Sequence, residues 1–176
     1  MATRRGFTLI ELLAVTAIVC ALGLLVLPRL AGSRARDRVL AQARNVVTLA
    51  QAARARAAGE GRAYLLVVDP TKGEARLLRR RDPLAAATDP EDPEREPADA
   101  TASWSRPIPF ADGVRVFSAE RLGEPVAAGE PLVVVFRPAG EADAARVVFE
   151  SAQGDLVTVT VEPATGRTTI VDGVLE

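Results

Sequence analysis

The chain contains no histidine and a single cysteine, Cys20. It therefore lacks the side chain that most often acts as a general base near neutral pH, and it cannot build a zinc site from cysteine and histidine ligands. Cys20 lies within an apolar run, where a thiol serves as a small filler and burial blunts its reactivity. A lone cysteine also excludes an intrachain disulfide. We expect no enzyme activity, no catalytic residue, no cofactor and no metal site.

An excess of charge of one sign is also lacking. The 22 basic and 23 acidic residues leave a formal net charge of −1. This balance gives no electrostatic reason to expect nucleic acid as a partner. With 176 residues, the chain has the length of one ordinary domain with an appendage.

What the sequence does have is a long apolar run at 7–30, FTLIELLAVTAIVCALGLLVLPRL, in which Glu11 is the only charge before Arg29. As a helix, this run would be about 36 Å long, which exceeds the roughly 30 Å hydrocarbon core of a bilayer. We predict a transmembrane or assembly helix at 7–30. Glu11 is unusual there, because an acidic residue deep in a membrane costs about 2.5–3.5 kcal/mol and normally marks a functional position.

Two other interpretations of the run stay open at this point. A removable signal peptide would have a similar basic start, and Ala31-Gly32-Ser33 is similar to its cleavage site, but its apolar core should be only about 7 to 15 residues long. An ordinary membrane anchor explains the length of the run. Neither interpretation explains Glu11.

The segment Gly6-Phe7-Thr8-Leu9-Ile10-Glu11, followed by an apolar helix, resembles the class III leader junction of type IV pilins and of the pseudopilins of type II secretion. The resemblance implies a leader at 1–6 that a prepilin peptidase cleaves after Gly6, and N-methylation of Phe7. It also implies that Glu11 pairs with the N-terminal amine of a neighbouring subunit. The chain would cross the inner membrane once, with its head in the periplasm.

The basic residues that flank the run do not by themselves predict this orientation. Arg4 and Arg5 precede it, whereas four arginines follow it, Arg29, Arg34, Arg36 and Arg38. The tendency of positive charge to stay in the cytoplasm would favour the opposite orientation. The resemblance places the leader inside, because processing occurs at the cytoplasmic face.

The segment 31–61 is predicted to continue the helix into the head. Apolar residues recur there on one helical face, at Val39, Ala43, Val46, Val47, Ala50 and Ala53. Gly59 and Gly61 provide the stop. Four arginines lie largely off the apolar face, where we expect a solvated surface rather than a contact with lipid headgroups or nucleic acid: Arg34, Arg38, Arg44 and Arg54.

The segment 62–176 is predicted to form a β head. Short β-branched runs separated by turns indicate strands at 63–68, 75–80, 114–118, 132–137, 146–150, 156–161 and 167–171. In the sixth of these, Val157, Val159 and Val161 alternate with threonines, which indicates one buried and one wet face. We expect one antiparallel sheet, and an α+β fold in which a long N-terminal helix packs on it.

The segment 82–107 is rich in proline and acidic residues and is predicted to be a mobile surface loop. Trp104, near its end, could attach the loop to the head or contact a partner. Asp89, Glu91 and Asp92 leave a weak calcium site as an alternative, but they lack the regular ligand spacing of an EF-hand.

The C-terminal part contains an apolar strand, the turn Pro138-Ala139-Gly140, a further apolar strand and a hairpin, and then the turn Thr165-Gly166-Arg167. This order resembles the heads of the GspH/FimT group of minor pseudopilins and pilins. The resemblance implies a pilin-like fold and a structural role in the pseudopilus of a type II secretion system. The implied partners are the prepilin peptidase, the major and other minor pseudopilins, and the inner membrane.

Two alternative functions remain. A FimT-like minor pilin would serve pilus biogenesis or DNA uptake, but Arg167 is followed by Thr168 and Thr169, so no basic cluster forms there. A secreted enzyme is disfavoured by the lack of histidine and by acidic residues that concentrate in a loop.

Overall fold

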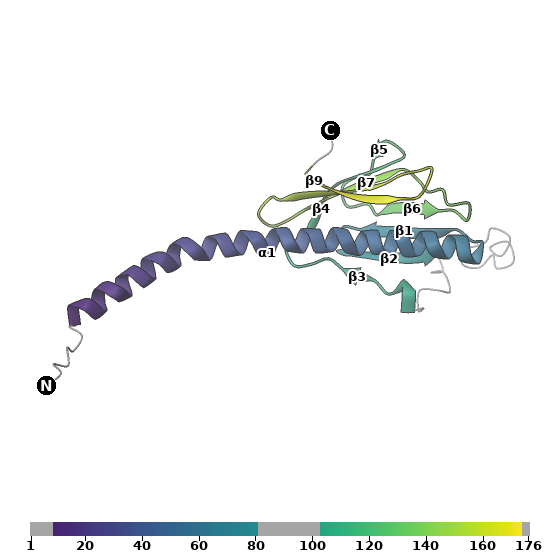
Figure 1. Ribbon diagram of the computed structural model, residues 1–176. Helices are drawn as coiled ribbons and strands as arrows, with labels where there is room; N and C mark the ends of the chain where they lie inside the picture. The colour runs from purple at the N-terminus through teal and green to yellow at the C-terminus, as the bar shows by residue number, and fades with distance from the viewer. Residues whose placement is uncertain (1–8, 81–102, 174–176) are drawn as a thin grey trace.

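The structure is a computed structural model that describes residues 9–80 and 103–173, with the side chains of 21–33 left out of the description. One helix, α1 (Leu9–Glu60), precedes a head made of β-strands. Figure 1 shows the second half of α1 lying along the strands and its first half extending away from them. The α+β class and the antiparallel pairing of the strands are therefore as predicted. The predicted leader 1–6, with Gly6, and the neighbouring Phe7 lie outside the described residues, as do 81–102 of the predicted loop.

The head half of α1 is held by a stripe of small and β-branched side chains. Val39, Ala43, Ala50 and Ala53 are fully buried, in agreement with the predicted apolar face. Alanines on this stripe let the helix backbone approach the strands closely. The helix ends at Glu60, and Gly61 follows with a φ of +65°, which terminates the helix without a steric penalty.

Four strands form the first sheet, in the order β3-β2-β1-β6 and with every pair antiparallel. They are β1 (Tyr64–Asp69), β2 (Glu74–Arg79), β3 (Ile108–Pro109) and β6 (Leu132–Phe136). The predicted turn between β1 and β2 is closed by Asp69, whose Oδ1 accepts from the backbone N–H groups of Thr71 at 2.9 Å and Lys72 at 3.0 Å.

Five strands form a second antiparallel sheet, in the order β5-β4-β7-β8-β9. They are β4 (Arg115–Arg121), β5 (Glu124–Pro125), β7 (Ala145–Glu150), β8 (Leu156–Val161) and β9 (Thr168–Asp172). The prediction of a single sheet was wrong. The chain leaves β6 after one isolated bridge, between Phe136 and Ala142, and the next strand then pairs with β4. Strand propensity shows where strands lie but not which strand each one pairs with.

The predicted wet face of β8 is wrong at Thr158. Its side chain is fully buried, and its Oγ1 donates a hydrogen bond to the carbonyl of Gly173 at 2.5 Å. Thr158 lies opposite Val148 on β7, which is buried as well. Both faces of the sheet are therefore covered at this point, and the threonine is accommodated because its hydroxyl has a partner.

The end of the predicted 82–107 loop is packed onto the head. Ser103–Ser105 form a short 3-10 helix, η1, and Ser105 Oγ donates to the carbonyl of Leu77 on β2 at 2.7 Å. The Trp104 ring meets Tyr64 edge to face at 5.4 Å between centroids, and the Arg56 guanidinium lies 4.9 Å from the Trp104 ring centre. The prediction that Trp104 attaches the loop to the head is confirmed.

The two C-terminal turns that resemble those of the GspH/FimT group lie against each other. Gly166 has a φ of +62°, and a Cβ placed on it would stand 2.9 Å from the carbonyl oxygen of Gly140. The N–H of Ala142 also donates to the carbonyl of Pro163 at 2.9 Å. Glycine at 166 is thus required both by its backbone conformation and by the approach of the other turn.

We predict that a fragment beginning at Ser33 folds as a soluble monomeric domain. The buried stripe of α1 and the two sheets cover each other without any contribution from the first half of the helix. Size-exclusion chromatography should give a monomer, and circular dichroism should show a cooperative melt. A fragment that stays unfolded would contradict the prediction.

Candidate functional site

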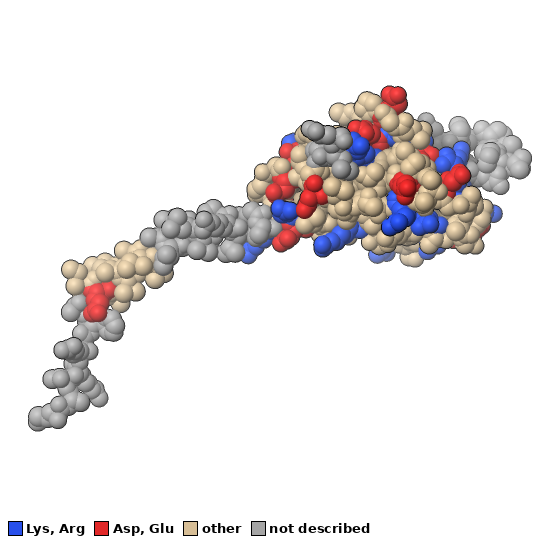
Figure 2. All heavy atoms as spheres, turned by 45° about the horizontal axis from the view of Figure 1, so that its top comes forward, with Lys and Arg blue, Asp and Glu red and all other residues tan. Residues whose placement is uncertain are grey.

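The first part of α1, Leu9–Cys20, is here called the arm, and its apolar side chains are exposed. Within the arm, seven large apolar side chains are 52–78% exposed: Leu9, Ile10, Leu12, Leu13, Val15, Ile18 and Val19. In Figure 2 the described part of the arm is mostly uncharged surface, in contrast to the charged surface of the head. Soluble monomers rarely expose apolar surface in this way, and such surfaces are typical of interaction sites.

Among the described residues, no helix combines the length and the apolarity that a membrane crossing requires. The predicted crossing at 7–30 includes residues 7 and 8 and the side chains of 21–30, which lie outside the description. It stays a prediction.

Glu11 lies in the first described turn of α1, surrounded in sequence by the exposed apolar residues of the arm. A carboxylate is favoured near the N-terminal end of a helix by the helix dipole. Thr16 returns its hydroxyl to the backbone, since its Oγ1 donates to the carbonyl of Leu12 at 2.8 Å. Cys20 is exposed on the arm, so within this chain it fills no core. Gly6 and Phe7, the predicted processing residues, lie outside the described residues.

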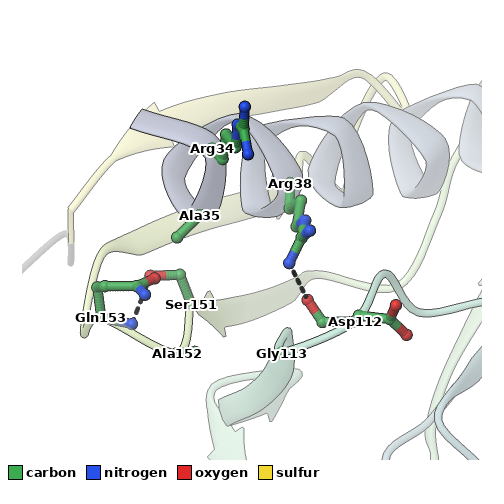
Figure 3. A pocket seen from close by; sticks show the side chains of 8 residues that line it. All are labelled: Arg34, Ala35, Arg38, Asp112, Gly113, Ser151, Ala152 and Gln153. Carbon is green, nitrogen blue, oxygen red and sulfur yellow. Dashed lines mark hydrogen bonds between the residues drawn. The ribbon is translucent and has the colours of Figure 1, made fainter. Parts of the chain in front are cut away.

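A cavity of about 250 Å³ lies at the start of the head half of α1, about 20 Å along the helix beyond the arm. It is lined by residues of α1, of the segment before β4, and of the β7–β8 turn: Arg34, Ala35, Arg38, Asp112, Gly113, Ser151, Ala152 and Gln153. Figure 3 shows Arg38 reaching toward the backbone of Asp112, to whose carbonyl its Nη1 donates at 3.5 Å. The sequence favoured solvated surface for these arginines over a contact with headgroups or nucleic acid, and it gave no sign of a cavity.

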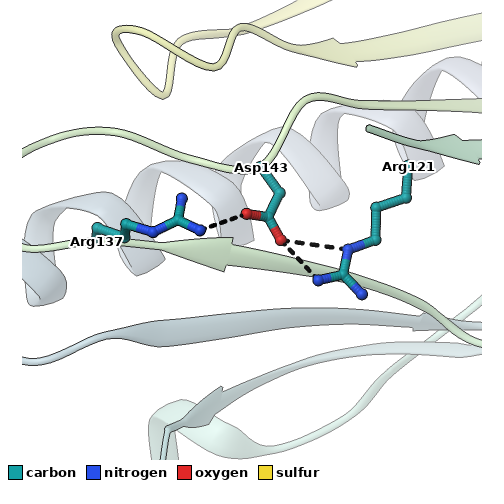
Figure 4. A network of polar contacts seen from close by, with 3 residues as sticks. All are labelled: Arg121, Arg137 and Asp143. Atoms are coloured by element: carbon teal, nitrogen blue, oxygen red, sulfur yellow. Dashed lines mark hydrogen bonds and ion pairs between the residues drawn. The ribbon is translucent and has the colours of Figure 1, made fainter. Parts of the chain in front are cut away.

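Asp143 is the centre of a polar cluster that the sequence analysis missed. It is 3% exposed and accepts from Arg137 Nη2 at 2.8 Å and from Arg121 Nη2 at 2.9 Å (Figure 4). The two arginines come from β4 and from the segment after β6, so the cluster joins the two sheets. Burial raises the pKa of Asp143, but the hydrogen bonds and charges of the arginines outweigh it, and its pKa is below its ordinary value.

Gln42 is a second buried polar residue without a signal in the sequence. It lies on the buried face of α1 and is fully buried, and its Oε1 accepts from the N–H of Ala111 at 3.3 Å. It ties the helix to the segment before β4. Within the described residues, no group of three His, Cys, Asp or Glu side chains is arranged to hold a metal ion. The alternative calcium ligands Asp89, Glu91 and Asp92 lie outside that part of the chain.

We predict that Asp143→Asn destabilises the head by about 1–3 kcal/mol at neutral pH, because it removes the charge of a buried acceptor that two partly exposed arginines share. The folded-state pKa lies below the unfolded one, so this contribution is present above about pH 4 and is lost as the pH falls through the folded pKa. Urea unfolding at several pH values measures it.

The matched control for this experiment is Asp112→Asn, which removes an exposed carboxylate. It should change the free energy of unfolding by less than about 0.5 kcal/mol. A difference between Asp143→Asn and the parent that is the same at neutral and at strongly acidic pH would contradict the role of the charge.

No family model and no curated protein sequence matches the chain. Among solved structures, the chain is similar to the minor pseudopilin EpsH from the type 2 secretion system of Vibrio cholerae, with a TM-score of 0.51 and 11% sequence identity. The match covers 77% of this chain and 97% of that one. At this identity the similarity establishes the fold, and the chain has the pilin-like fold of a minor pseudopilin.

Proposed function

We propose that the chain is a structural minor pseudopilin, GspH-like, that joins the periplasmic pseudopilus of a type II secretion system through its arm. The observation that carries the proposal is the contrast within α1: the part from Ala35 on buries one face against the head, and the arm presents exposed apolar side chains. Such a helix is suited to a bilayer before assembly and to a bundle of like helices after it. The pilin-like fold and the Gly6–Glu11 motif support the same conclusion.

Glu11 has a defined part in this proposal. A carboxylate in apolar surroundings is costly alone, but the cost is offset when it faces an ammonium group, and a register that leaves either group unpaired is penalised. The N-terminal amine created by cleavage after Gly6 would supply that ammonium from a neighbouring subunit. Glu11 thereby selects the axial register in which the helices pack.

The remaining partners follow from this assembly route. The prepilin peptidase would act on the leader at the cytoplasmic face and methylate Phe7. The chain would wait in the inner membrane as a single-pass protein with its head in the periplasm, and the major and other minor pseudopilins would then receive it. None of these steps requires a cofactor or a catalytic residue of this chain.

A FimT-like role in DNA uptake is less well supported. Salt-dependent binding to DNA needs several phosphate contacts. The turn that carries Arg167 also carries Glu162, whose Oε2 accepts from Thr165 Oγ1 at 2.6 Å. Basic and acidic side chains are interspersed on the face of the head in Figure 2.

We predict that the mature chain begins with N-methylated Phe7. Gly6 precedes the apolar run directly, and a residue without a Cβ lets a protease approach the following peptide bond. Intact-mass and N-terminal peptide mass spectrometry of the chain purified from membranes decide this. A mature start after Ser33 would instead indicate a signal peptide.

We predict that Glu11→Gln and Glu11→Ala leave cleavage and membrane insertion intact but reduce assembly. Insertion becomes easier by up to about 2.5–3.5 kcal/mol because a charge leaves the apolar run. Assembly becomes weaker because the variant has no carboxylate to pair with the N-terminal amine of a neighbouring subunit. The measurement is the amount of the variant that co-purifies with the major subunit, together with secretion, in a strain that carries only the variant.

The matched control for Glu11 is Asp37→Asn, which removes an exposed carboxylate from the same helix outside the arm. It should assemble like the parent. If both Glu11 variants also co-purify and secrete like the parent, Glu11 does not set the register.

A further inference from the structure

The lining of the Arg34–Arg38 cavity carries two positive charges and one negative charge. Arg34 and Arg38 are four residues apart, so they project from the same side of α1, and both are exposed. Two like charges at this spacing repel each other. An anion placed between the two guanidinium groups would remove that repulsion.

Among the residues that line the cavity, the acidic ones do not neutralise these arginines. Asp37, an exposed carboxylate three residues after Arg34 on α1, is not part of the lining. Asp112 is the one acidic residue in the lining, and Figure 3 shows its carboxylate turned away from Arg38. Its carbonyl meets Arg38 Nη1 only at 3.5 Å, the weak limit of a hydrogen bond. Two further carboxylates nearby are engaged: Asp155 accepts from Ser151 Oγ at 2.9 Å, and Asp172 pairs with Arg36 at 2.8 Å.

The cavity is large enough for a polyatomic anion. Its volume of about 250 Å³ is well above the roughly 10–15 Å³ that one water molecule needs. Guanidinium groups bind phosphate oxygens through paired hydrogen bonds, and Arg is favoured over Lys for this task. Phosphate is therefore the group that this cavity suits.

The length of α1 determines where such a phosphate would be found. This step rests on the proposed function, in which the arm lies in the membrane. Arg34 is 25 residues after Leu9, or about 37 Å along the helix. A bilayer has a hydrocarbon core of about 30 Å and measures about 40–45 Å with its headgroups. With Leu9 near one interface, the cavity lies at the headgroup level of the opposite leaflet.

We infer that the Arg34–Arg38 cavity binds the phosphate of an anionic membrane phospholipid on the side of the membrane that faces the head. The bound headgroup fixes the depth of the arm and holds the head against the membrane surface before assembly. It also gives a reason for arginines on the flank of the apolar run where positive charge is normally sparse.

The experiment uses the full chain in vesicles of phosphatidylcholine with a minority of phosphatidylglycerol. After extraction in mild detergent, native mass spectrometry measures the ratio of the two lipids retained by the protein. We expect phosphatidylglycerol to be enriched over its bulk share, by on the order of fivefold for each arginine involved. Arg34→Gln with Arg38→Gln should return the ratio to its bulk value.

The matched control is Arg44→Gln with Arg54→Gln, which makes the same charge change on exposed residues of the same helix. Neither arginine lines the cavity: Arg44 lies about 9 Å and Arg54 about 24 Å beyond Arg38 along α1, at or beyond a Debye length of about 8–10 Å. The control should keep the enrichment. Equal loss in both double variants, or no enrichment in the parent, would overturn the inference.

Two further measurements separate a lipid ligand from free phosphate, and this inference from the proposed function. Retention of phosphatidylglycerol in buffer without inorganic phosphate supports a lipid ligand. In buffer with inorganic phosphate, a phosphate adduct on a chain that enriches no phosphatidylglycerol in either buffer identifies free phosphate as the ligand and overturns the assignment to lipid. Flotation with pure phosphatidylcholine vesicles tests the arm itself. A chain that does not float contradicts the proposed function, while one that floats without enriching phosphatidylglycerol contradicts only this inference.

Discussion

The buried stripe of α1 is the contact on which the rest of the head depends. The helix packs against β1, β2 and β6 of the first sheet and against β7, β8 and β9 of the second. Each sheet therefore covers part of one helical face, and the helix is the element that both sheets share. Ala43, Ala50 and Ala53 are fully buried on this face. Because their side chains are short, strands of both sheets can approach the helix backbone closely.

The same helix continues beyond the head with a different surface. In the head half, polar residues such as Arg44 lie opposite the buried stripe, whereas the arm has exposed apolar residues. One continuous helix joins the two halves, so the position of the arm along the helix axis also sets the position of the head. This arrangement suits a subunit that is held by one end and presents the other.

Buried polar residues determine how the pieces of the head fit together. Asp143 links arginines from the two sheets, and Gln42 links α1 to the segment before β4. The partners lie 6 residues apart for Arg137 and Asp143, 22 for Arg121 and Asp143, and 69 for Gln42 and Ala111. Because a buried polar group without a partner is costly, these contacts penalise alternative arrangements of the sheets.

Local patterns in the sequence determined the positions of the secondary-structure elements. Periodic apolar residues located α1, glycines its end, and β-branched runs the seven longer strands, because these signals act over a few residues. The composition of 7–30 and the motif around Glu11 determined which surface should be functional. Tertiary structure alone decided that the strands form two sheets, that Thr158 is buried, that Asp143 meets two arginines, and that Arg34 and Arg38 border a cavity with the β7–β8 turn. These outcomes depend on which distant segments meet, and a pairing between segments far apart in the chain leaves no periodic trace in either one.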